Sequence, residues 1–126
     1  MPDRNDNQPP DFGVFENVIK EFYERAFADP IIGHFFFNKD HTHLIRQQTL
    51  FTLNMMGYEG FEYQGKPLKK AHSALPLTNV HFNRRKVLLQ EVLAASPVPE
   101  ATRDRWLTLE EKLRPLIVNS QTNCRH

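Results

Sequence analysis

The stretch FENVIKEFYERAFADP, residues 15–30, decides the fold class of this chain. Its apolar side chains recur at steps of three and four residues: Phe15, Val18, Ile19, Phe22, Tyr23 and Ala26. This spacing is typical of an amphipathic helix, because it places those side chains on one face. Asp11 is suited to cap the helix, and Asp29-Pro30 interrupts the pattern. We therefore expect a helix from residue 11 to about residue 28.

Outward from this stretch, the helical spacing of apolar residues returns several times, and no stretch alternates between apolar and polar residues as a half-buried strand does. Further helices are predicted over about 42–56, 67–74, 79–95 (with Thr78 as cap) and 100–118. Between the first two helices, IIGHFFFNKD (residues 31–40) forms a corner in which Asn38 adopts the left-handed conformation. Gly57 ends the second helix, and Pro76 ends the short one. The sequence thus predicts an all-α fold of four longer helices and a short one.

Length and composition indicate one domain with loose ends. The chain has 126 residues, and its first ten, MPDRNDNQPP, combine prolines with charged and amide side chains. We expect a disordered arm over residues 1–10, one domain over 11–119 and a flexible tail over 120–126. The lone Cys124 lies in that tail, so neither an internal disulfide nor a cysteine-based metal site is expected.

Charge and hydropathy exclude two classes of partner. The 16 Lys and Arg residues against 15 Asp and Glu leave a net charge near +1, which offers no positive field for nucleic acid. No run of about 18 apolar residues occurs, and the N-terminus lacks the pattern of a signal peptide. We therefore expect a cytoplasmic protein with neither nucleic acid nor a membrane as partner.

Two polar residues lie on faces that are otherwise apolar. Gln48 shares a face of the second helix with Leu44, Phe51 and Met55. A buried amide needs a partner, so Gln48 either bonds to a backbone carbonyl in the core or meets a ligand. Tyr23 on the first helix has the same two possibilities, because its ring suits the core while its hydroxyl needs a partner.

The chain has six histidines, and metal-ligand spacing is the first property to consider for them. His41 and His43 are two residues apart and do not share a helix face, which argues against zinc. His72 lies in KPLKKAHSAL (residues 66–75), between Leu68 and Leu75, and points toward the apolar side of that short helix. A lone histidine in this setting is more often a core residue than a ligand, although imidazole is also the commonest axial ligand of haem iron.

Other catalytic signatures are absent from the sequence. It contains no glycine-rich phosphate loop, no G-x-S-x-G turn and no H-E-x-x-H. The basic pairs Lys69-Lys70 and Arg84-Arg85 are interpreted as solvated helix faces, with the alternative that one cation meets an anionic group of a cofactor.

Several of these stretches, in order and in spacing, resemble one protein family. They are FYERAFADP followed by HFF and an Asp, then LIRQQTLF, then KPLKKAHSALPLTNVHF, and finally the long last helix. Together they resemble the truncated haemoglobins, or 2-on-2 globins, closest to group I, over about residues 12–119. The resemblance implies a two-over-two helical sandwich around haem. Two turns depart from the family pattern, FFFNKD at the corner and MMGYEG after the second helix.

The resemblance also implies roles for individual residues. His72 matches the proximal histidine that binds the iron, and the carbonyl of Leu68 would accept a hydrogen bond from its other ring nitrogen. Tyr23 matches the tyrosine whose hydroxyl reaches the bound gas, and Gln48 lies beside it. Tyr23, Gln48 and His72 are separated by 25 and 24 residues, as in the family.

Three apolar residues complete the implied site. Phe36 would pack on the haem, Leu44 would lie on the gas-binding side, and Phe82 would lie near the haem edge. Leu44 and Gln47 occupy the positions from which a second ligand would reach the iron, so a five-coordinate haem b is expected.

The resemblance implies binding of O2, NO and CO, with nitric oxide dioxygenase activity supported by an unidentified reductase. A haem-based sensor or a peroxidase-like protein is the alternative, and a haem-free interaction module is a third possibility. Whether the chain is an enzyme stays open, and a monomer or weak dimer is expected.

Overall fold

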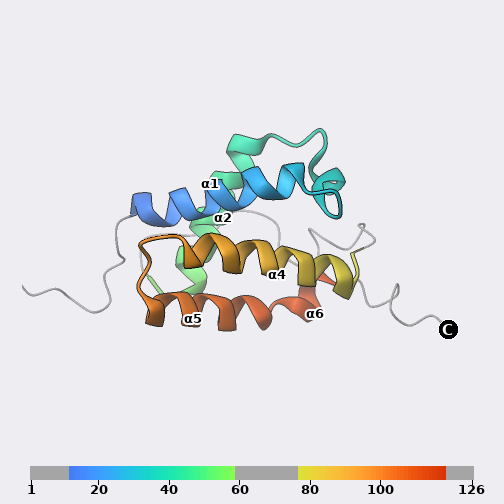
Figure 1. Ribbon diagram of the computed structural model, residues 1–126. Helices are drawn as coiled ribbons and strands as arrows, with labels where there is room; N and C mark the ends of the chain where they lie inside the picture. The colour runs from blue at the N-terminus through green and yellow to red at the C-terminus, as the bar shows by residue number, and fades with distance from the viewer. Residues whose placement is uncertain (1–11, 59–76, 119–126) are drawn as a thin grey trace, which may run out of the picture.

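The computed structural model describes residues 12–58 and 77–118, which form helices joined by turns, with no strand in those two ranges (Figure 1). The elements are α1 (Phe12–Ala28), the 3-10 helix η1 (Gly33–Phe36), α2 (His41–Met55), α4 (Asn79–Ala94), α5 (Glu100–Glu111) and α6 (Arg114–Ile117). The all-α fold class is confirmed. The predicted arm, tail and short helix over 67–74, with Leu68 and His72, lie outside the described residues.

The helices form two packed pairs. Helix α1 packs against both α2 and α4, and α4 in turn contacts α5 and α6. Figure 1 shows α1, α4 and α5 stacked one above another, with α2 crossing behind them. The pair α1/α2 therefore lies on the pair α4/α5, as a two-over-two sandwich requires.

Helix α1 buries the face that its apolar spacing predicts. All six predicted apolar residues of this helix are buried. Near its N-terminus, Phe15 stacks on Trp106 of α5, with ring centroids 4.9 Å apart. The ring of Tyr58 meets the ring of Phe15 edge-on, with centroids 6.0 Å apart. These rings fix one end of α1 in the core, which leaves Phe22 and Tyr23 toward the other end.

The corner between α1 and α2 is held by its own polar groups. The Asp29 carboxylate accepts hydrogen bonds from the backbone N–H groups of Ile31 and Ile32, at 2.9 and 3.1 Å. Asn38 has a φ of +67°, which confirms the predicted left-handed residue. Asp40 then caps α2 by accepting from the N–H of His43 at 3.1 Å. The corner thus sets the direction in which α2 leaves α1.

The last predicted helix is wrong as a single element. Helix α5 ends at Glu111, and a separate short α6 begins at Arg114. Pro115 gives the reason, because in a continuous helix its ring would clash with the carbonyl group of Glu111, four residues earlier. At the N-terminus of α4, Thr78 caps the helix as predicted.

Candidate functional site

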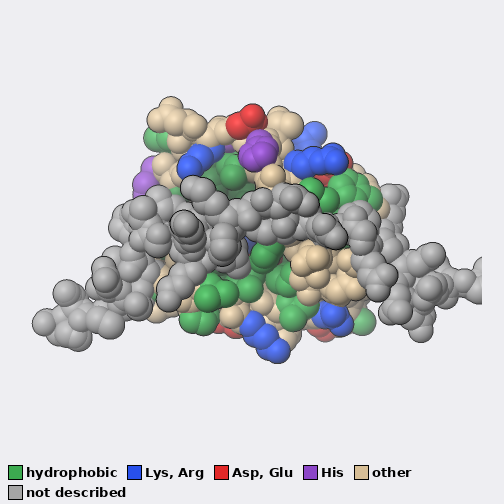
Figure 2. Space-filling model, turned by 180° about the vertical axis from the view of Figure 1, so that it is seen from behind, with side chains coloured by type: hydrophobic (Ala, Val, Ile, Leu, Met, Phe, Trp, Pro, Cys, Tyr) green, Lys and Arg blue, Asp and Glu red, His purple; other side chains and the backbone are tan. Residues whose placement is uncertain are grey.

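A cavity of about 270 Å³ lies among α1, the corner, α2, the start of α4 and α6. Its lining within the described residues comes from all of these elements: Phe22, Tyr23, Ile32, Phe35, Phe36, Lys39, Leu44, Gln47, Gln48, Phe51, Leu77, Thr78, His81, Phe82, Arg85, Leu113 and Ile117. Figure 2 shows the molecule from behind, with hydrophobic side chains (green) toward the middle of this face and Lys and Arg side chains (blue) above and below them. The cavity is therefore mostly apolar, with a few polar groups directed into it.

The cavity brings together the predicted site residues that the structure describes. Tyr23 comes from α1, Phe36 from η1, Leu44 and Gln48 from α2, and Phe82 from α4. Leu68 and His72 lie outside the described residues, so the structure does not place them. Residues far apart in the sequence thus line one space.

Aromatic rings form much of the cavity wall. Tyr23, which is 7% exposed, meets Phe36 edge-on, with ring centroids 5.6 Å apart. Phe82 is 3% exposed and lines the wall contributed by α4. Phe22, Phe35 and Phe51 complete the set. Such a wall suits a flat aromatic group, which gains both apolar burial and ring contacts there.

The amides of α2 supply polar groups at the cavity. The Nε2 atom of Gln48 donates to the hydroxyl of Thr52 at 3.4 Å, which is long for a hydrogen bond. The Oε1 atom of Gln47 is buried and has no hydrogen-bond partner within the described ranges. The backbone carbonyl considered for Gln48 from the sequence is thus replaced by a weak side-chain contact. Both amides can still bond to a molecule in the cavity.

His81 lines the cavity and was missed by sequence reasoning. Its Nδ1 atom accepts a hydrogen bond from the backbone N–H of Thr78 at 2.9 Å. Burial lowers the pKa of His81, and the neighbouring His34 lowers it further. The ring is therefore neutral at pH 7 and carries its proton on Nε2. Its place three residues after the cap Thr78 was the available signal.

The interpretation of Arg84-Arg85 as a solvated face is wrong. Arg84 forms an ion pair at 2.7 Å with Asp29, whose side chain is 2% exposed. The hydrogen bond from Arg84, with those from the corner backbone, holds the pKa of Asp29 below its usual value despite burial. Arg85 pairs at 2.5 Å with buried Glu110 and lines the cavity. Each arginine is paired with a buried carboxylate, although Arg84 keeps 35% of its side chain accessible.

A comparison with known families identifies the fold around this cavity. A family model described as bacterial-like globin matches residues 12–119. The chain belongs to the bacterial-like globin family. Globins are haem proteins that bind small gas ligands. Among the described residues of this globin, no helix is long and apolar enough to cross a membrane.

Individual relatives of this globin are group 1 truncated haemoglobins, which confirms the resemblance. One from Tetrahymena pyriformis is 38% identical over 72 residues, covering 54% of this chain and 59% of that protein. One from Mycolicibacterium paratuberculosis is 29% identical over 108 residues, covering 86% and 79%. The globin thus aligns with just over half the length of the Tetrahymena relative.

A solved structure agrees with the fold of this globin. The crystal structure of the Tetrahymena pyriformis truncated haemoglobin in its Fe(III) form has a TM-score of 0.75 and 28% sequence identity. The match covers 83% of this chain and 89% of that one. The two-over-two arrangement is therefore shared with a truncated haemoglobin.

Proposed function

We propose that this globin binds haem b in the cavity and holds a diatomic gas there. The observation that carries the proposal is the gathering of Tyr23, Gln48 and a wall of phenylalanine rings around one space. The residues fit the group, because the wall is aromatic and Gln47 and Gln48 on the same wall carry amide N–H groups that can donate to a bound gas. A flat apolar macrocycle with a polar ligand at its centre needs both features.

Residues of this chain would hold the haem from several sides. Phe36, Leu44 and Phe82 offer apolar contacts, and His72 is the proposed iron ligand. The carbonyl of Leu68 would accept a hydrogen bond from the other nitrogen of His72 and so fix its ring plane. When bound, haem supplies the iron to which a small gas coordinates.

Tyr23 and Gln48 are the proposed donors to the gas. The hydroxyl of Tyr23 and the amide of Gln48 each can donate a hydrogen bond, while Leu44 cannot. Structures of the Tetrahymena pyriformis protein include a tyrosine-to-phenylalanine variant and a glutamine-to-glutamate variant 25 positions further on. The same separation joins Tyr23 to Gln48 here, which supports the assignment.

For the use of the gas, we propose reversible oxygen binding with nitric oxide dioxygenation. An unidentified reductase would return the iron to its ferrous state between turnovers. No histidine occupies the α2 positions that line the cavity, which are those of Leu44, Gln47, Gln48 and Phe51. This supports a five-coordinate ferrous form with one open position for the gas.

The absorption spectrum of haem-loaded protein tests the proposal. The ferrous protein is expected to shift its Soret band on addition of carbon monoxide, and His72→Ala is expected to change the iron ligation. His43→Ala, at an exposed position of α2, is the matched control and leaves the spectrum as it is. Absence of a carbon monoxide shift, or unchanged ligation in His72→Ala, would show that the haem assignment is wrong.

Rapid mixing of the oxygenated protein with nitric oxide tests the proposed reaction. We expect nitrate to form within the mixing experiment and the ferric spectrum to appear at the same rate. Slow nitrate formation together with fast turnover of peroxide would overturn the dioxygenase assignment in favour of a peroxidase-like protein.

A further inference from the structure

Arg85 places a cationic side chain on the wall of the cavity. It lies on α4, lines the cavity, and keeps 20% of its side chain accessible. Its guanidinium carbon lies over the ring of Phe22, 5.1 Å from the ring centroid. Phe22 lines the same cavity. The charge is thus held against an aromatic surface that faces the proposed gas-binding space.

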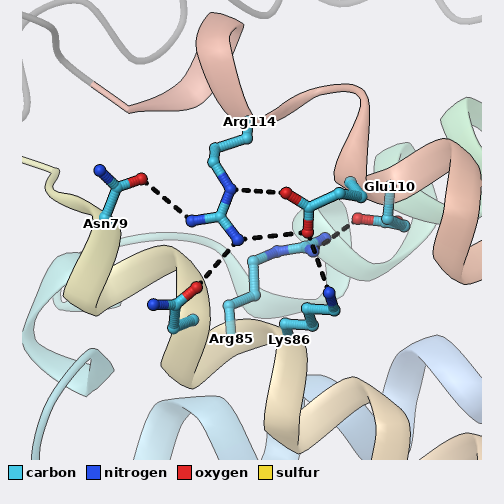
Figure 3. A network of polar contacts seen from close by, with 7 residues as sticks. Asn79, Arg85, Lys86, Glu110 and Arg114 are labelled. Carbon is cyan, nitrogen blue, oxygen red and sulfur yellow. Dashed lines mark hydrogen bonds and ion pairs between the residues drawn. The ribbon is translucent and has the colours of Figure 1, made fainter.

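The carboxylate that partners Arg85 lies behind it. Glu110 on α5 bonds through Oε1 to Nη1 of Arg85 at 2.5 Å, and its side chain is 5% exposed (Figure 3). Among the described residues that line the cavity, Arg85 is present and Glu110 is not. The ion pair therefore turns its positive end toward the cavity and its negative end toward the space between α4 and α5.

The guanidinium keeps both its charge and spare donors. Burial acts to lower the pKa of Arg85, but the Coulombic attraction and hydrogen bond of Glu110, with a smaller contribution from Tyr23, raise it overall. A guanidinium has five N–H donors. Within the described ranges, its hydrogen bond to Glu110 uses Nη1 alone. Lys39, in the corner between η1 and α2, is a second cationic side chain that lines the cavity.

We propose that Arg85 forms a binding site for a small inorganic monoanion, such as azide or nitrite, inside the haem cavity. The proposal rests on haem occupying this cavity, as proposed above. A single positive charge, partly compensated by Glu110 and directed at the cavity, suits a monoanion of a few atoms beside the haem. The carboxylate of Glu110 weakens this attraction without blocking it, because it lies on the far side of the guanidinium.

Azide titration of the ferric, haem-loaded protein tests the site. Glu110→Gln removes the opposing charge and is expected to tighten azide binding several-fold. The double variant Arg85→Met with Glu110→Gln removes both charges, leaves no unpaired buried ion, and is expected to weaken azide binding roughly tenfold. Imidazole, titrated at a pH well above its pKa so that it is neutral, is expected to bind all three proteins within about twofold of one another.

A second ion pair on α4 provides the matched control. Arg84 and Asp29 form the same kind of pair, and neither lines the cavity. The double variant Arg84→Met with Asp29→Asn is therefore expected to leave azide affinity as in the wild type. If Arg85 had a merely structural role, a variant would change its affinities for azide and imidazole by the same factor. Glu110→Gln and the double variant Arg85→Met with Glu110→Gln would then both change azide affinity in the same direction.

Three outcomes would overturn the proposal. Azide affinity that is equal in wild type, Glu110→Gln and the double variant would remove Arg85 from the site. Equal losses of azide and imidazole affinity would show a structural role. Loss of haem with unchanged azide affinity in the Arg85 double variant would mean that Arg85 pairs with a carboxylate of haem. Carbon monoxide binding by the same wild-type preparation tests the haem proposal separately.

Discussion

Tyr23 combines an apolar ring with a polar hydroxyl in one buried side chain. The ring packs against Phe22 and Phe36, with centroids 5.2 and 5.6 Å away. The side chain is nearly fully buried, and it lines the cavity. Because phenylalanine preserves the ring and removes the hydroxyl alone, Tyr23→Phe separates packing from hydrogen bonding.

Tyr23→Phe is expected to speed oxygen dissociation about tenfold, since a hydrogen bond to a partly charged ligand contributes about 1.5 kcal/mol. Stopped-flow measurement on the ferrous protein gives the rate. Tyr58→Phe is the matched control, because Tyr58 packs on Phe15 and does not line the cavity. An unchanged rate in Tyr23→Phe would exclude its hydroxyl as a donor to the gas.

Gly33 allows the chain to turn tightly after α1. A Cβ atom at this position would lie 2.5 Å from the carbonyl oxygen of Phe27 and 3.2 Å from that of Ala26. Both are backbone atoms, so no side-chain rotation relieves the contact. Gly33 also begins η1, which carries Phe35 and Phe36 to the cavity. The need for glycine at this turn is therefore linked to the position of Phe35 and Phe36 in the cavity wall.

Gly33→Ala is expected to lower the free energy of unfolding by about 1–3 kcal/mol, through overpacking against the backbone. Urea denaturation measures the loss. Gly57→Asn provides the contrast: Gly57 has a φ of +93°, and a Cβ there would lie 3.6 Å from Nη2 of Arg105, an ordinary contact with a side chain. Asparagine tolerates positive φ better than most residues. Equal stability of Gly33→Ala and the wild type would contradict the close contact.

At the scale of the element, α6 is held in place by α4 and α5. Four residues are too few for a helix to be stable alone. The guanidinium of Arg114 donates to Asn79 and Asn83 of α4 at 3.0 and 2.8 Å, and to Glu111 at 2.6 Å (Figure 3). Arg114 also lies over the ring of Phe82, 4.3 Å from its centroid. This network positions two cavity residues near Arg114 in the chain: Leu113 directly before it and Ile117 at the end of α6.

Acid is expected to weaken this network through Glu111. Hydrogen bonds from Arg114 and Lys86 lower the pKa of Glu111 from 4.5 to about 2. A carboxyl group whose pKa is lowered on folding contributes stability above its unfolded pKa, and loses it as the pH falls. The contribution is therefore complete above about pH 5 and disappears between about pH 4.5 and 2. Glu111 is 40% exposed, so solvent screening limits it to about 1 kcal/mol.

The measurement is the unfolding free energy of Glu111→Gln and wild type across this pH range. We expect a deficit in the variant at pH 7 that closes near pH 2. Glu100→Gln is the control, because Glu100 is 79% exposed and its distance to Arg103 is 3.6 Å. A deficit in Glu111→Gln that stays constant from pH 7 to pH 2 would exclude the ionised carboxylate as its cause.

At the scale of the whole molecule, the sequence predicts the helices better than their contacts. The apolar steps of α1 appear in the structure as one buried face, since periodicity depends on local geometry. Arg84 and Arg85 were misread because Asp29 and Glu110 lie 55 and 25 residues away. A long-range ion pair leaves no local pattern. The break before α6 had a local signal, Pro115, but the helical spacing of apolar residues over 100–118 continues past it.

For the candidate site too, the sequence predicts which residues share a helix face but not what that face contacts. Periodicity places Gln48 and Leu44 on one face of α2, but it does not say whether that face meets the core or a cavity. The family resemblance supplied that assignment, and the structure places both residues on the cavity wall. Lys39, His81 and Arg85 were missed as cavity residues, because a polar side chain looks solvated when its own segment is read alone. Their positions follow from how the two helix pairs meet.

Because both helix pairs line the cavity, haem is expected to stabilise the whole molecule. A ligand that binds the folded state alone raises stability by an amount that grows with its concentration above Kd, about 2.7 kcal/mol at one hundred times Kd. Thermal unfolding with and without haem measures this gain as a rise in Tm. Phe82→Leu removes a ring from the cavity wall, so it is expected to reduce the gain itself.

Leu53→Val is the matched variant, because Leu53 is fully buried in the core and does not line the cavity. It is expected to lower the Tm of the haem-free and haem-loaded proteins equally, by the loss of about one buried methylene. The difference between the two variants therefore isolates contact with haem from general core packing. An equal haem-induced rise in Phe82→Leu and Leu53→Val would place the haem away from Phe82 and from the wall that α4 contributes.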